Sequence, residues 1–131
     1  MTSKKPLYTV PVPSTSFTVE PYFDGRGVLP AIRFGYHKDG VEHQGGIEFS
    51  KLAAVRTRVE RCCTPWHIEG AYDTLVEVVG SSWVEEMRAD TAERWRYEWE
   101  MHHYMIYLDS AGCFEVIAES WAAVEPVDGP E

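Results

Sequence analysis

The chain has 131 residues, with 12 Lys and Arg against 21 Asp and Glu, so its formal charge is −9 and its pI is near 5.0. This is the length of a single domain, and no stretch approaches the ~18 uncharged apolar residues of a membrane span. The N-terminus lacks the apolar core of a signal peptide, and three cysteines do not make a secreted disulfide framework. The sequence therefore predicts a soluble cytoplasmic protein with no membrane partner.

The charge is unevenly distributed along the chain. Residues 1–65 hold nine basic and six acidic side chains, whereas residues 66–131 hold three and fifteen and contain all five tryptophans. Because phosphate binding needs a basic stripe and only segment 51–61 offers one, nucleic acid is disfavoured as a partner. The acids either form a solvated face paired internally with the basic half, or they form a surface that meets a basic partner.

The first elements in chain order are strands. Residues 1–15 contain three prolines, which predicts an extended or mobile arm ahead of a globular domain at 16–124. Alternating β-branched and aromatic residues predict strands at 16–23 and 28–37, and Lys38-Asp39-Gly40 is typical of a hairpin turn into a return strand from Val41. At the other end, residues 125–131 read as a polar tail.

Residues 51–63 fit two structures. Apolar residues at positions 52, 55, 59 and 62 have helical spacing, with Ser50 as a possible cap. The apolar positions 47, 49, 53, 55 and 59 also share one parity, so a long strand that continues from residue 47 fits nearly as well. The strand is favoured narrowly.

The acidic half begins with an apolar run at 74–79, which predicts a core strand. Ser82 can then cap a helix with Glu85 and Glu86 in its first turn, ending between residues 91 and 94. From Trp95 the pattern changes to period two, which predicts a strand to residue 101. Segments 103–109 and 113–121 form the strongest hairpin signal in the chain. Together the elements predict an α+β fold, in which a mainly antiparallel sheet of about six strands is packed by one or two helices in a single domain.

Metal binding and catalysis have weak signals. Enough zinc ligands are present, but their spacing does not follow the knuckle pattern of structural zinc sites; they are Cys62, Cys63, His67, His102, His103 and Cys113. We therefore expect no metal and no cofactor, with small core cysteines and histidines that flank the sheet.

Nucleophilic catalysis would need a cysteine to meet His67 or His103 in space, with Asp73 or Glu69 orienting the imidazole. The chain has no glycine-flanked nucleophile elbow, no phosphate-binding glycine loop and no HExxH motif. A metal-binding or cysteine-dependent enzyme therefore stays only as an alternative.

The aromatic residues are more informative. Trp95, Tyr97 and Trp99 would share one face of the expected strand 95–101. Such a ladder usually packs in the core, here against Trp83 and Met87 of the helix. Alternatively, the rings lie exposed among acids as the anchors of a protein interface, or they line a pocket for a small ligand.

We therefore predict a non-enzymatic protein-interaction module whose acidic, aromatic surface binds a basic protein partner. In composition alone it is comparable to immunity proteins that occlude a nuclease and to inhibitors that imitate nucleic-acid charge. The predicted protein-binding residues are Glu85, Glu86, Asp90, Glu93, Trp95 and Glu98. The alternative is a small-molecule-binding domain with an aromatic pocket between sheet and helix, lined by Tyr72, Trp99, His103 and Tyr104. An edge strand could pair with a second copy, so a homodimer is left open.

Overall fold

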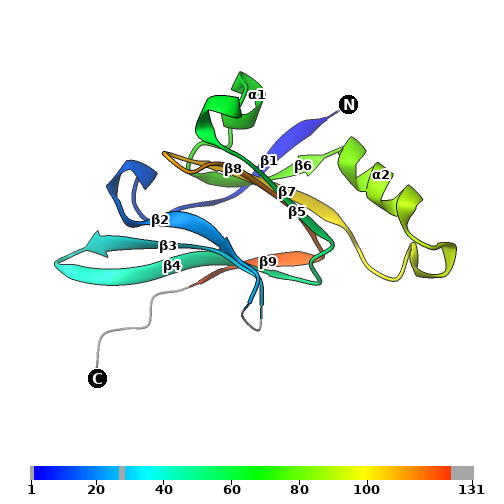
Figure 1. The fold of residues 1–131 in the computed structure, drawn as a ribbon, viewed down its shortest axis with the longest axis horizontal. Coiled ribbons are helices and arrows are strands. Elements are labelled where there is room, and N and C mark those ends of the chain that lie inside the picture. The colour runs from blue at the N-terminus through cyan, green and yellow to red at the C-terminus, as the bar shows by residue number, and fades with distance from the viewer. Residues whose placement is uncertain (1, 27–28, 125–131) are drawn as a thin grey trace.

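The computed structural model describes residues 2–26 and 29–124, which form two layers of antiparallel sheet (Figure 1). The strands are β1 (Ser3–Thr9), β2 (Phe17–Asp24), β3 (Ala31–Lys38), β4 (Val41–Ser50), β5 (Ala54–Arg58), β6 (Thr74–Val79), β7 (His102–Leu108), β8 (Gly112–Ala118) and β9 (Ser120–Val124). The helices are α1 (Pro65–Ile68) and α2 (Ser82–Asp90), and 3-10 turns occupy Ser14–Ser16, Glu60–Cys62 and Glu93–Trp95. Within these residues, no helix is long and apolar enough to span a membrane.

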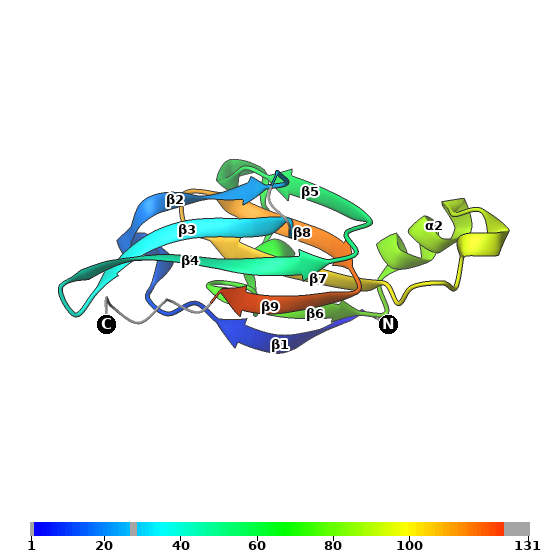
Figure 2. The same cartoon turned by 90° about the horizontal axis from the view of Figure 1, so that it is seen from below.

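The mainly antiparallel architecture is confirmed, but the expected number of about six strands is too low. The described residues contain a five-stranded sheet in the order β1-β6-β7-β8-β5 and a four-stranded sheet in the order β2-β3-β4-β9. Figure 2 shows the four-stranded sheet in front of the other. The sequence predicts one strand where the structure has β4 and β5, and one strand where it has β8 and β9. In each case the two strands belong to different sheets. The remaining extra strand, β1, comes from the expected N-terminal arm.

The strands change sheets at one corner of the sandwich. Between β4 and β5 the chain turns through Lys51, which has a φ of 50°, and between β8 and β9 it turns at Glu119. The Lys51 ammonium lies 3.4 Å from the Glu119 carboxylate, and Glu119 N–H donates to the Ser50 carbonyl at 3.0 Å. Segment 51–63 is therefore neither the expected helix nor one long strand. After the turn it forms the short strand β5 and then the Glu60–Cys62 3-10 turn.

Both expected hairpins are present. The β3–β4 turn has Asp39 and Gly40 at φ values of 54° and 78°, the two left-handed positions that a tight type I′ turn needs. The β7–β8 hairpin pairs Leu108 with Gly112 and continues in register to His102 and Ala118. Strand β6 has the bounds that the apolar run 74–79 predicts. These elements are the ones in which apolar alternation and turn residues agree.

The main core lies between the two sheets. Alternate residues of each strand point inward, as the two-residue period of a strand requires. The buried set comprises Val10, Ile32, Phe34, Tyr36, Ile47, Phe49, Leu75, Tyr104, Ile106, Leu108, Phe114, Val116 and Ala118. The opposite faces of β6, β7 and β8 bury a smaller cluster of Ala71, Val76, Val78, Met105, Tyr107 and Cys113, against which Ile68 of α1 and Cys63 pack. The five-stranded sheet is thus covered on both faces.

The expected extended or mobile N-terminal arm is extended and paired in the structure. Strand β1 is an edge strand that pairs with β6, and its register shifts between Pro6 and Tyr8. Residues 27–28, which belong to the expected first turn and second strand, lie outside the described residues. The same holds for the expected polar tail, residues 125–131.

Candidate functional site

A long excursion, residues 80–101, joins β6 to β7. These strands are antiparallel neighbours in the sheet, with Val76 opposite Met105 and Glu77 opposite Tyr104. Such neighbours can be joined by a turn of a few residues, and longer connections in compact domains are often functional. Figures 1 and 2 both show α2 and the turns after it extending beyond the end of the two sheets.

Helix α2 confirms the expected helix, with a different cap. Ser81, rather than Ser82, is the N-cap, and its Oγ accepts the Val84 N–H at 3.2 Å. The helix ends at Asp90, and the Thr91 hydroxyl donates to the Met87 carbonyl. None of the α2 residues is buried, so the helix leaves most of its surface to solvent.

The expected strand at 95–101 is wrong. Residues 93–99 form a 3-10 turn followed by further turns. Alternating residues form a strand only where a neighbouring strand can pair with them, and β6 is already paired with β1 and β7. In addition, the Arg96 guanidinium donates to the Ala89 and Thr91 carbonyls at 3.4 and 3.2 Å, and Arg88 donates to the Arg96 carbonyl at 3.1 Å. These bonds fold the chain back onto the end of α2.

The aromatic residues of this segment are exposed, so of the alternatives left open for them, packing in the core is excluded. Trp95, Tyr97 and Trp99 are 54%, 81% and 40% exposed. The Arg94 guanidinium lies 5.1 Å from the Trp95 ring and Arg88 lies 5.8 Å from the Tyr97 ring, which are cation–π distances. Three large exposed rings on one projecting segment form a larger apolar surface than the single exposed apolar residues that are common on soluble proteins.

An apolar groove lies between the excursion and the corner where β4 leads to β5. It is about 300 Å³ in volume. Its lining residues are Leu52, Ala53, Met87, Thr91, Trp95, Trp99 and Met101. Apart from the Thr91 hydroxyl, these side chains are apolar, so the groove suits an apolar group rather than an ion.

The six predicted protein-binding residues, five acids and Trp95, all lie on the excursion and are all exposed. They comprise Glu85, Glu86 and Asp90 in α2, Glu93 and Trp95 in the 3-10 turn, and Glu98 after it. The structure therefore brings the six residues together on one projecting segment, beside the apolar groove.

The four residues of the alternative ligand pocket do not come together. His103 and Tyr104 are neighbours in β7 and point to opposite faces of the sheet, Tyr104 into the main core. Tyr72 is half exposed and stacks on Tyr107, while Trp99 lines the groove of the excursion. The aromatic cavity of the described residues lies at the β4–β5 corner rather than between sheet and helix.

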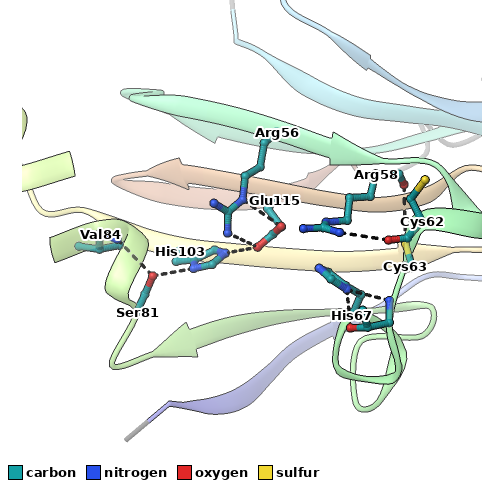
Figure 3. Close-up of polar contacts among 10 residues, drawn as sticks. Arg56, Arg58, Cys62, Cys63, His67, Ser81, Val84, His103 and Glu115 are labelled. Atoms are coloured by element: carbon teal, nitrogen blue, oxygen red, sulfur yellow. Dashed lines mark hydrogen bonds and ion pairs between the residues drawn. The ribbon is translucent and has the colours of Figure 1, made fainter. Parts of the chain in front are cut away.

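A second feature at the base of the excursion is a chain of polar side chains, Ser81–His103–Glu115–Arg56 (Figure 3). The Ser81 hydroxyl lies 2.7 Å from His103 Nδ1, and His103 Nε2 lies 2.8 Å from Glu115 Oε1. The Arg56 guanidinium donates two hydrogen bonds of 3.0 Å to the same carboxylate. Glu115 and His103 are only 2% and 3% exposed, and Trp83 of α2 packs edge to face with the His103 ring, while the Arg56 guanidinium lies over the Trp83 ring at 3.9 Å.

The charge state of Glu115 sets the direction of these hydrogen bonds. Burial alone would raise the pKa of this carboxyl, but the hydrogen bonds and charges of His103 and Arg56 outweigh burial and lower it to about 2. Glu115 is therefore ionised at neutral pH and accepts from His103 Nε2–H. In the neutral imidazole, Nδ1 then accepts the Ser81 hydroxyl proton, while Ser81 Oγ accepts the Val84 N–H.

Sequence reasoning missed this chain. Its signals were weak, namely a glutamate inside the apolar run of β8 and a histidine at the buried-face parity of β7. The hairpin register places these two near each other, but Ser81 and Arg56 come from distant parts of the sequence. Only the packing of α2 and β5 brings them together.

A third cluster lies under α1, at the other end of the same sheet face (Figure 3). The His67 Nδ1 accepts the Thr64 N–H at 3.0 Å and closes a capping box, and burial lowers the pKa of His67. Cys63 Sγ lies 3.5 Å from the Val59 carbonyl, and Arg58 donates to the Cys62 carbonyl at 3.1 Å. The His67 contact caps α1, and the contacts of Cys63 and Arg58 lie at the preceding Glu60–Cys62 turn. No group of three or more His, Cys, Asp or Glu side chains in residues 2–26 and 29–124 is placed to hold a metal ion.

The cysteines should differ in reactivity. Cys62 is exposed, whereas Cys113 is buried and burial raises its pKa to about 12. Because the thiolate is the nucleophile, we expect iodoacetamide at pH 8 to alkylate Cys62 first and Cys113 only after unfolding. Burial also raises the pKa of Cys63, so its reaction should be slower than that of Cys62. Intact mass against time checks this, and rapid addition of three groups to the folded protein would contradict it.

No protein family model, curated protein or solved structure matches this chain.

Proposed function

We propose that this protein binds a basic protein partner through the excursion, residues 80–101. The observation that carries the proposal is the exposure of Trp95 and Trp99 beside an apolar groove, on a segment that projects from the domain. Tryptophans in a desolvated groove supply much of the free energy of many protein interfaces, and polar residues around them exclude water. Binding of this kind needs no catalytic step.

The charge on the excursion supports a basic partner. The segment carries six acidic side chains and three arginines. Two of the arginines, Arg88 and Arg96, donate to backbone carbonyls of the excursion itself, and Arg94 lies over Trp95. The acids at positions 85, 86, 90, 93 and 98 are exposed on the same segment as the rings. Complementary charge would speed the encounter, and the groove would take an apolar side chain of the partner.

The test compares variants in a pull-down from lysate of the native host, washed at low and at high salt. Reversal of Glu85, Glu86 and Asp90 to lysine should lower the captured amount of a basic, stoichiometric partner by about tenfold at low salt. The control variant reverses three exposed glutamates away from the excursion to lysine, namely Glu20, Glu42 and Glu69. It has the same change in net charge as the excursion variant. We expect the control variant to retain the partner.

A second variant tests the groove. Trp95→Ala should shorten the lifetime of the complex, because loss of a buried anchor mainly raises the dissociation rate. The control variant and wild type should show equal thermal unfolding, as should Trp95→Ala, since the ring lies outside the core. Equal capture by wild type, Trp95→Ala and the excursion reversal would refute the proposal, as would equal loss in the control reversal.

A further inference from the structure

In the chain of polar side chains at the base of the excursion, a serine hydroxyl, an imidazole and a carboxylate follow one another, as they do where a histidine base activates a serine nucleophile. When the His103 imidazole is neutral, the Ser81 hydroxyl donates a hydrogen bond to its Nδ1, and its Nε2–H donates to the ionised Glu115 carboxylate, which Arg56 holds at two points. In serine hydrolases the same series of hydroxyl, imidazole and carboxylate activates the hydroxyl, whatever the order in the sequence. In the serine hydrolase triad, Nε2 of the histidine faces the serine and Nδ1 faces the acid. In this protein Nδ1 of His103 faces the serine and Nε2 faces the acid, so the two ring nitrogens have the opposite roles.

Ser81 also borders an open cavity. A cavity of about 250 Å³ is lined by Ser81 and His103 together with Val78, Val84 and Met101. Its carboxylates, Glu77 and Glu85, would repel a negatively charged ligand. The space therefore suits a small uncharged or cationic molecule with a short apolar group.

The start of α2 supplies the remaining requirement, a site for developing negative charge. Ser81 is the N-cap at the junction of β6 and α2. The N–H groups of Ser82 and Trp83 lie in the first turn, where an α-helix offers no carbonyl partner of its own. Ser82 and Trp83 follow Ser81 directly in the chain, and N–H groups of a first helical turn can stabilise an oxyanion that forms on a nearby carbonyl.

We infer that Ser81 is a nucleophile that accepts an acyl group from a small uncharged or cationic carboxylic ester in the cavity lined by Val78, Val84 and Met101. This activity is separate from partner binding by the excursion. His103 is the base, and Glu115 and Arg56 are positioning residues that fix its ring.

The reaction balances without a cofactor. Ser81 Oγ forms a bond to the ester carbonyl carbon as its proton moves to His103 Nδ1, and the carbon–oxygen bond to the alcohol breaks as His103 returns that proton to the alcohol. Water then loses a proton to His103 and its oxygen bonds to the acyl carbon. Ser81 Oγ leaves and takes the proton back, so one ester and one water give one acid and one alcohol.

The test uses a fluorophosphonate probe and 4-nitrophenyl butyrate with the full chain. We expect one probe group per wild-type chain at Ser81, located by peptide mass spectrometry, and measurable hydrolysis of the ester. Ser81→Ala and Ser81→Asn should each lower both signals by about a hundredfold or more. Asparagine is a good N-cap, so Ser81→Asn keeps the helix start if the alanine variant proves unstable.

Ser16→Ala is the control, because Ser16 is an exposed serine of the Ser14–Ser16 turn and does not line the cavity. It should retain labelling and hydrolysis within about twofold. The inference is overturned if folded wild type stays unlabelled while a reference serine hydrolase is labelled in the same tube. It is equally overturned if Ser81→Asn is labelled and hydrolyses the ester like wild type, or if the probe is found on another residue.

Discussion

Glu115→Ala is expected to lower the free energy of unfolding by about 3 kcal/mol, measured by urea denaturation at pH 7. The substitution leaves the buried His103 ring and the Arg56 guanidinium without the carboxylate that accepts their hydrogen bonds. Because the Arg56 side chain is half exposed, water can replace part of the loss, and the expected value is at the lower end of the range for a broken buried pair. The chain of side chains at the base of α2 should then loosen.

Glu119→Ala provides the comparison. Its carboxylate pairs with the exposed Lys51 ammonium at 3.4 Å, so its removal should cost less than about 1 kcal/mol. Equal effects of the two substitutions would mean that burial does not distinguish the two carboxylates. In that case the buried contacts of Glu115 would stabilise the fold no more than the exposed Lys51–Glu119 pair does.

The contribution of Glu115 also depends on pH. Its pKa is lowered from 4.5 to about 2 on folding, so the folded state binds this proton less readily than the unfolded chain. The stabilisation, on the order of 3 kcal/mol, is present above pH 4.5 and declines as the pH falls toward 2. The difference in unfolding free energy between wild type and Glu115→Ala should therefore be smaller at pH 3 than at pH 7. A constant difference would contradict this.

Gly112→Ala is the second substitution with a large expected effect, about 3 kcal/mol or more. Gly112 begins β8 at a φ of 96°, and a Cβ there would lie 2.0 Å from the Arg58 carbonyl oxygen and 2.9 Å from the Glu60 nitrogen. Both neighbours are backbone atoms of the adjoining β5 segment, so they cannot move without disturbing the β5–β8 pairing. Thermal unfolding followed by circular dichroism measures the loss.

Gly40→Ala separates the two causes. Gly40 also has a positive φ, 78°, but a Cβ there would meet nothing within 4 Å. It should cost only the backbone strain of about 1 kcal/mol. If both variants lost the same stability, the close approach of β5 to Gly112 would contribute nothing.

The elements that could be predicted from the sequence are those with two agreeing signals. The apolar run of β6, the type I′ turn at Asp39 and Gly40, and the β7–β8 hairpin each combine alternation with turn residues or flanking breaks. The division into two sheets could not be predicted, because alternation continues through Lys51 and Glu119 while the backbone turns there. A pattern of side chains does not record which neighbouring strand its backbone will pair with.

The candidate sites also differ in how far the sequence predicts them. The acids of α2 are predicted as a surface patch from the acidic composition of the second half and from the helix signals at Ser82, Glu85 and Glu86, all of which are read from the local sequence. The aromatic residues at 95, 97 and 99 alternate like a strand, but the pairing partner they would need is missing from their surroundings in the described sheets. The Ser81–His103–Glu115–Arg56 chain depends on contacts between distant segments, which no local pattern contains.

The edge strands of the five-stranded sheet resist pairing with a second chain. Strand β1 carries Lys4 and Lys5, and Pro6, which has no N–H to donate, lies beside the register shift. At the other edge, β5 presents Arg56 and Arg58. Cations, a proline and an irregular ladder each disfavour edge-to-edge association, which is the first step of strand-mediated aggregation. Four of the nine basic residues in the first half of the chain thus lie on the two edge strands of this sheet, where their charge disfavours pairing with a second chain.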